Sequence, residues 1–174
     1  MSHRFVPVSR RHFLAGSTSA LLLPALRPGR QMPQTSQQPP VPPKPDPLPD
    51  ALVREFVIKG HGDLAGTKAL LEEHPQLLNA CWDWGGGDFE TALEGAGHVG
   101  SKDCAQYLLS KGARLNIFAA TMLGRLDIVK ATLTAFPDLV RSRGPHGLTF
   151  LHHARKGGPD AEPVLEYLVS LGAD

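Results

Sequence analysis

Between residues 51 and 174, apolar side chains recur in short helical patterns that are separated by glycine. A glycine, a short polar stretch and an amphipathic segment follow one another four times, at residues 60–80, 97–116, 122–140 and 156–174. In each amphipathic segment a pair of apolar residues marks the face of a helix that should be buried. The pairs are Leu70 with Leu71, Leu108 with Leu109, Ile128 with Val129, and Leu165 with Leu168. An internal repeat of this kind predicts stacked helix pairs.

Residues typical of helix ends accompany this pattern. Thr91 and Thr149 precede apolar runs, and each can cap a helix by accepting a backbone N–H bond. Glycine follows the predicted helices, where a left-handed conformation ends a helix at no steric cost. These glycines are Gly100 and Gly124 after first helices, and Gly112 and Gly172 after second helices. Each repeat should therefore contain two helices.

The segments Thr91–Ala96 (TALEGA) and Thr149–Ala154 (TFLHHA) match the pattern Thr-Pro-Leu-His-x-Ala. This resembles the ankyrin repeat, and the resemblance covers residues 51–174. It implies an all-α ankyrin-repeat solenoid of about four helix-turn-helix repeats, in which His152 would hydrogen-bond between repeats. Aligned glycines lie 38, 24 and 34 residues apart, against a family period of about 33. The third repeat is short because its first helix begins at once, at Ile117, without a preceding finger.

The first fifty residues differ in composition from the rest. Residues 1–26 combine a basic start with a short, mildly apolar stretch, which is typical of a secretory signal. Within them Ser9, Arg10, Arg11, Phe13 and Leu14 resemble the twin-arginine motif of bacterial export. We therefore expect export by the twin-arginine translocase and a periplasmic or secreted location. Cleavage after Ala25 and retention as an anchor both remain open.

Residues 27–50 are rich in proline and lack aromatic side chains, so we expect a disordered linker. The net charge of +1 is the sum of +4 in residues 1–50 and −3 in residues 51–174. An acidic repeat domain does not suit nucleic acid. No apolar run reaches the ~18 residues that a membrane span needs.

Candidate chemistry is sparse. The stretch Gly95–Lys102 resembles a phosphate-binding loop, but its serine precedes its lysine, and the repeat pattern places it at a helix end. The chain has eight histidines but no His-Glu-x-x-His, so we expect no metal site, no cofactor and no enzyme activity. Cys104 falls at a position that should be buried, which favours a free thiol. A disulfide with Cys81 remains open, because export leads to an oxidising space.

The expected function is binding to an unidentified protein through finger loops and the concave face of the first helices. One finger is acidic and aromatic, a second is basic, and first helices line the surface between them. The candidate contact residues are Trp82, Asp83, Trp84, Asp88 and Phe89; Arg141, Arg143 and His146; and Glu94, His98, Phe118, Met122 and His153. Trp82 equally suits packing on the preceding helix pair, with Trp84 exposed, and Phe118 equally suits the core.

Two other functions remain open for this surface. The chain could inhibit one dedicated partner enzyme, as an immunity-like protein does. More remotely, it could bind a small ligand or a metal ion.

Overall fold

The computed structural model describes residues 44–174. The predicted export motif and most of the linker, residues 1–43, lie outside the described residues. Residues 44–49, the end of the linker, form no helix or strand. None of the described helices is both long and apolar enough to cross a membrane.

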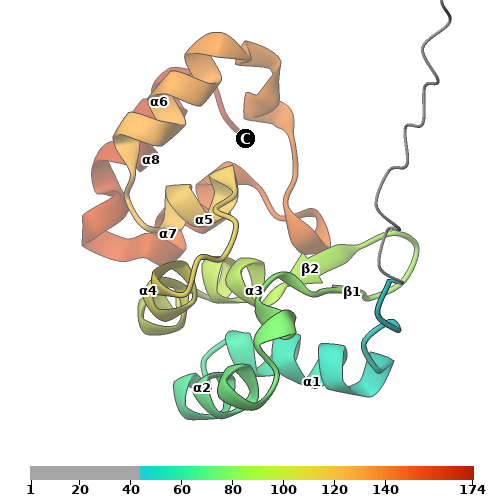
Figure 1. The fold of residues 1–174 in the computed structure, drawn as a ribbon. Coiled ribbons are helices and arrows are strands. Elements are labelled where there is room, and N and C mark those ends of the chain that lie inside the picture. The colour runs from blue at the N-terminus through green and yellow to red at the C-terminus, as the bar shows by residue number, and fades with distance from the viewer. Residues whose placement is uncertain (1–43) are drawn as a thin grey trace, which may run out of the picture. The chain divides into compact units, whose positions relative to one another are not determined.

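The described residues are mostly helical, in agreement with the expected class (Figure 1). The α-helices are α1 (Asp50–Gly60), α2 (Leu64–Glu73), α3 (Ala92–Val99), α4 (Lys102–Ser110), α5 (Ile117–Met122), α6 (Leu126–Ala135), α7 (Phe150–Gly157) and α8 (Glu162–Ser170). Short 3-10 turns are η1 (Pro75–Asn79), η2 (Pro137–Arg141), η3 (Pro145–Gly147) and η4 (Gly158–Ala161). Strands β1 (Cys81–Asp83) and β2 (Phe89–Thr91) form an antiparallel hairpin.

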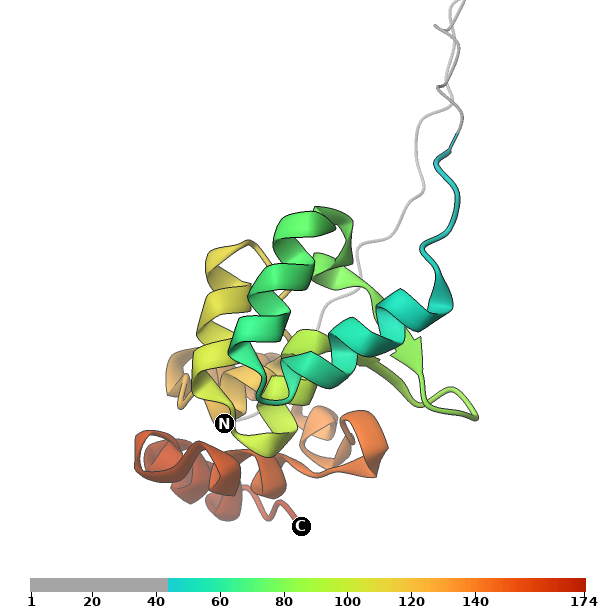
Figure 2. The same ribbon diagram turned by 90° about the horizontal axis from the view of Figure 1, so that it is seen from below.

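Helix pairs stack along the chain from α1 to α8 (Figures 1 and 2). The first helices pack in order, α1 against α3, α3 against α5 and α5 against α7. The second helices also pack, α2 against α4 and α6 against α8. Helix α3 additionally contacts α7, two repeats further along the chain. That contact is possible because α5 has only six residues and no finger precedes it.

The predicted helix ends are confirmed. Thr91 Oγ1 accepts the amide of Glu94 at the start of α3, and the Glu94 carboxylate accepts the Thr91 amide at 2.8 Å. Thr149 Oγ1 accepts the amide of His152 at the start of α7. The glycines expected after helices all have positive φ, namely Gly100 (85°), Gly112 (92°), Gly124 (68°) and Gly172 (73°).

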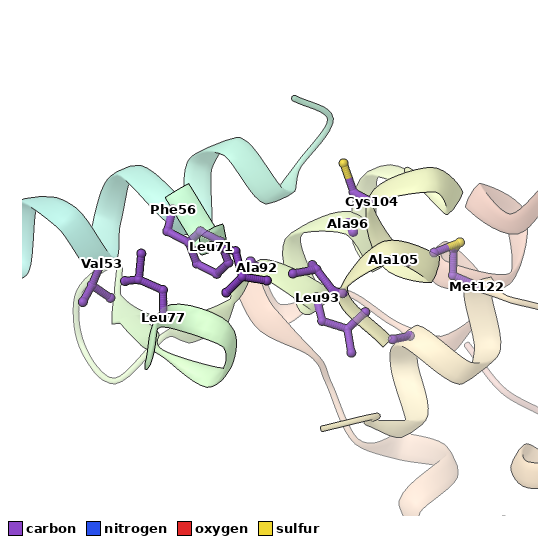
Figure 3. Packing of buried hydrophobic residues seen from close by; sticks show 12 residues of the cluster. Val53, Phe56, Leu71, Leu77, Ala92, Leu93, Ala96, Cys104, Ala105 and Met122 are labelled. Carbon is purple, nitrogen blue, oxygen red and sulfur yellow. The ribbon is translucent and has the colours of Figure 1, made fainter. Parts of the chain in front are cut away.

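Two apolar clusters form the core. The first joins α1–α4 to Met122, and Figure 3 shows its side chains. The second lies among α5–α8. In each predicted apolar pair one side chain is fully buried and its neighbour is half-buried. The buried members are Leu71, Leu108, Val129 and Leu168.

Helices α5 and α7 approach closely at Gly157. An added Cβ at Gly157 would overlap the carbonyl oxygen of Met122, whereas one at Gly62 would have no neighbour within 4 Å. We expect Gly157→Ala to lower the free energy of unfolding by about 1–3 kcal/mol, because the helices must move apart. The control Gly62→Ala should change it by less than about 0.5 kcal/mol. Urea unfolding measures both, and equal effects would show that α7 does not approach α5 in this way.

Candidate functional site

Two fingers meet on the side of the first helices. The first is the β1–β2 hairpin, whose turn contains Gly85, Gly86 and Gly87, all with positive φ. Asp83 closes this turn by accepting the amides of Gly85 and Gly87. The second finger comprises residues 141–147 and ends in η3. The hairpin thus has a turn conformation that glycine adopts without a steric penalty.

Asp88 and His146 join the fingers. One carboxylate oxygen of Asp88 accepts the backbone N–H of His146 at 2.8 Å, and the other lies 2.7 Å from its Nδ1. His146 has a φ of 58°, a left-handed conformation that is uncommon outside glycine. The hydrogen bond from the His146 amide lowers the pKa of Asp88 below its ordinary value. The tip of the second finger is therefore attached to the first by two contacts.

Glu90 is a fully buried carboxylate, with 0% of its surface exposed. Trp84 Nε1 donates to its Oε2 at 2.7 Å. His98 Nε2 lies 2.9 Å from Oε1 and 3.0 Å from His61 Nε2. Oε1 accepts no hydrogen bond of favourable geometry. His61 Nε2 and His146 Nε2 each lie 3.5 Å from this carboxylate.

We call His61, Glu90, His98 and His146 the His–Glu cluster. One ligand atom from each residue lies within 4.8 Å of the others. Burial by itself raises the pKa of Glu90, but the contact with His98, the charge of His61 and the Trp84 hydrogen bond outweigh it, so the pKa is lowered. These groups therefore favour the charged form of the Glu90 carboxylate, although its own surface is buried.

The sequence did not predict this cluster. Its members come from the residue after α1, from β2, from α3 and from η3, and His61 and His98 are 37 residues apart. One signal was present: both histidines directly follow a glycine, Gly60 or Gly97, near the end of a first helix. Two histidines that recur at about the interval of one repeat are expected to lie close together in a stack of helices.

The aromatic residues of the hairpin lie differently from expectation. Trp82 packs against the first apolar cluster, which was one of the two alternatives. Trp84 is only half-buried, with its indole bonded to Glu90 and the Arg54 guanidinium 5.6 Å from its ring. The large exposed side chain is instead Phe89, at 58%. The alternative that leaves only Trp84 exposed is therefore right about Trp82 and wrong about Trp84, while Phe89 is exposed as its place among the candidates requires.

Two candidate contact residues are buried and cannot face a partner. Met122 is 0% exposed and His153 is 1% exposed. The backbone of Gly144 covers His153, and an added Cβ there would stand 3.3 Å from its ring. Phe118 belongs partly to the core, because its ring stacks on Phe150 with centroids 4.6 Å apart. The expectation that His153 projects toward the concave surface is therefore wrong.

Several of the candidates line a shallow groove between the fingers, with a volume of about 250 Å³. Its lining includes Asp88, Phe89 and Glu94 on one side, Arg143 and Pro145 on the other, and Phe118. Arg143 is exposed and lies 3.7 Å from a carboxylate oxygen of Asp174. Arg141 is exposed outside this lining. The groove therefore brings the acidic and aromatic finger next to the basic one.

Both cysteines are free thiols in the structure. Cys104 is buried in the first apolar cluster, as its position in the repeat predicts. Cys81 is exposed as a residue in β1. Its sulfur is partly shielded from water, and this shielding, together with nearby carboxylates, raises the pKa of the thiol. These positions agree with the expectation of unpaired cysteines.

Burial lowers the pKa of His153 from its ordinary 6.5 to about 4. The unfolded chain therefore takes up a proton between pH 6.5 and 4 that the folded chain excludes. We expect the free energy of unfolding to fall by up to about 3 kcal/mol over this range. His153→Asn, measured by urea unfolding at several pH values, should remove this part of the loss. His74→Asn, at a partly exposed position, should not. An unchanged pH profile in His153→Asn would contradict the assignment.

No protein-family model, curated protein or solved structure matches this chain.

Proposed function

We propose that this chain is an exported bacterial protein-interaction module of the ankyrin-repeat type, without enzyme activity, that binds a protein partner between its two fingers. The observation that carries the proposal is the groove, whose lining includes exposed Phe89 of the hairpin and exposed Arg143 of the second finger. An aromatic side chain and an arginine are common energetic anchors of protein interfaces.

Several features support the ankyrin-type interpretation. First helices pack in order, threonines cap α3 and α7, and glycines with positive φ follow α3 and α5. His152 Nε2 lies 2.8 Å from the carbonyl oxygen of His98, so this histidine joins helices of different repeats, as the resemblance implies. In such stacks the fingers and first helices present the binding surface.

The charges around the groove favour a protein over a polyanion. Asp88 and Glu94 lie on one side and Arg143 on the other. Part of this polarity is used internally, since Asp88 binds His146 and Glu94 caps α3. Phe89 and Arg143 are the exposed side chains of this lining, and Arg143 makes only a long ion pair with Asp174. Complementary charge around an apolar anchor gives specificity toward one protein surface.

We expect a photoreactive phenylalanine analogue at position 89 to form a covalent adduct with the partner in cells that produce the native chain. The same analogue at Phe136, which is 63% exposed in the turn after α6, is the matched control and should form none. Arg143→Ala, combined with the analogue at position 89, should reduce the adduct several-fold. Mass spectrometry of the crosslinked bands identifies the partner.

Identical adducts from positions 89 and 136, or none from position 89, would contradict binding in the groove. Adducts with a single enzyme would favour a dedicated inhibitor, whereas several partners would favour a general module.

A further inference from the structure

The His–Glu cluster has hydrogen bonds that orient its imidazole nitrogens inward. His61 Nδ1 lies 2.9 Å from the carbonyl oxygen of Val57, which can only accept, so Nδ1 carries the proton. His146 Nδ1 faces the Asp88 carboxylate at 2.7 Å and is fixed in the same way. In the neutral rings, the Nε2 atoms of both histidines therefore present lone pairs toward Glu90. Histidines that ligate metal ions are typically held by such Nδ1 hydrogen bonds.

The Nε2 lone pairs of His61 and His146 and the carboxylate of Glu90 lie close together, and a positive charge between them would be stabilising. Glu90 is fully buried, and its Oε1 has no hydrogen-bond partner. His98 Nε2 and His61 Nε2 are 3.0 Å apart, so only one of the two can hold a proton between them. A buried carboxylate without a complete set of partners is costly. A bound cation would satisfy Oε1 and the imidazole lone pairs together.

The spacing and chemistry of the donors fit zinc. In a tetrahedral zinc site, ligand atoms ~2.0–2.1 Å from the ion lie roughly 3.3 Å apart. The four donor atoms already lie within 4.8 Å of one another, and the His98–His61 pair at 3.0 Å. Three imidazoles with one carboxylate suit zinc and related transition metals, while calcium and magnesium prefer oxygen ligands.

We propose that His61, Glu90, His98 and His146 bind one Zn²⁺ ion. Four protein ligands leave no position for a substrate, which indicates a structural site. The ion would connect the end of α1, the hairpin, α3 and the second finger, and would so fix the groove between the fingers. The site goes beyond the proposed function and does not depend on it, because its donors are present whatever the partner is.

The test uses the full chain after removal of metal with a chelator. Titration with Zn²⁺ against a chromophoric chelator should give one tight site per chain, and thermal unfolding should shift upward with Zn²⁺ but not with Mg²⁺. Co²⁺ should give the intense visible absorption of a tetrahedral site without a thiolate charge-transfer band. That last result excludes Cys81 as a ligand.

Variants locate the site. His146→Ala changes a residue on the partly exposed finger tip and should abolish tight binding while the helical circular dichroism stays unchanged. Asp88→Asn, which alters only the partner of His146, should weaken Zn²⁺ binding about 10–100-fold. His74→Ala, a histidine outside the cluster, is the matched control and should bind as the native chain does.

Three results would overturn the proposal: absence of a one-to-one Zn²⁺ site, equal affinity in His146→Ala and the native chain, or a thiolate band with Co²⁺. In each case the cluster would be a network in which protons, rather than a metal ion, balance Glu90. Because these measurements use Zn²⁺ alone, their failure leaves the crosslinking test of partner binding unaffected.

Discussion

The arrangement of both fingers depends on the short third repeat. Helix α5 has six residues and begins directly after its cap, Asn116, whose side chain accepts the amide of Ala119. With no finger in this repeat, α3 contacts α7, and His152 reaches the His98 carbonyl. The fourth repeat's finger can then contact the hairpin of the second, 58 residues earlier in the chain. A stack with a full third finger would hold these two fingers apart.

The contact between the two fingers also brings a further side chain to the buried carboxylate of Glu90. A carboxylate without exposed surface is stable in a folded protein only when paired groups replace its water. Trp84 donates one hydrogen bond to this carboxylate. His61 and His98 lie within 3.5 Å of it from the first two repeats, and His146 Nε2 lies 3.5 Å away on the second finger. Oε1 itself accepts no hydrogen bond. The electrostatic environment of the Glu90 carboxylate in the hairpin therefore depends on where the second finger lies.

Local features of the fold could be predicted from the sequence, because each depends on a few neighbouring residues. The Thr91 cap and the Gly100 helix end are examples, since each depends on a rule for one helix terminus. The His–Glu cluster could not be predicted in the same way, because its members come from three repeats. The burial of His153 could not be predicted for a related reason, because the backbone that covers it belongs to the second finger. The internal role of Trp84 could not be predicted either, because the acceptor of its indole, Glu90, is buried by contacts between repeats.

The contact between the fingers is tested most directly by hydrogen exchange at the His146 amide. That amide donates across to Asp88, whereas the amide of the next residue, Gly147, donates to Gly144 within its own finger. We predict that the His146 amide is protected from exchange in the native chain and loses its protection in Asp88→Ala, while the Gly147 amide keeps its protection. Unprotected exchange at His146 in the native chain, or protection that survives Asp88→Ala, would contradict the joining of the two fingers.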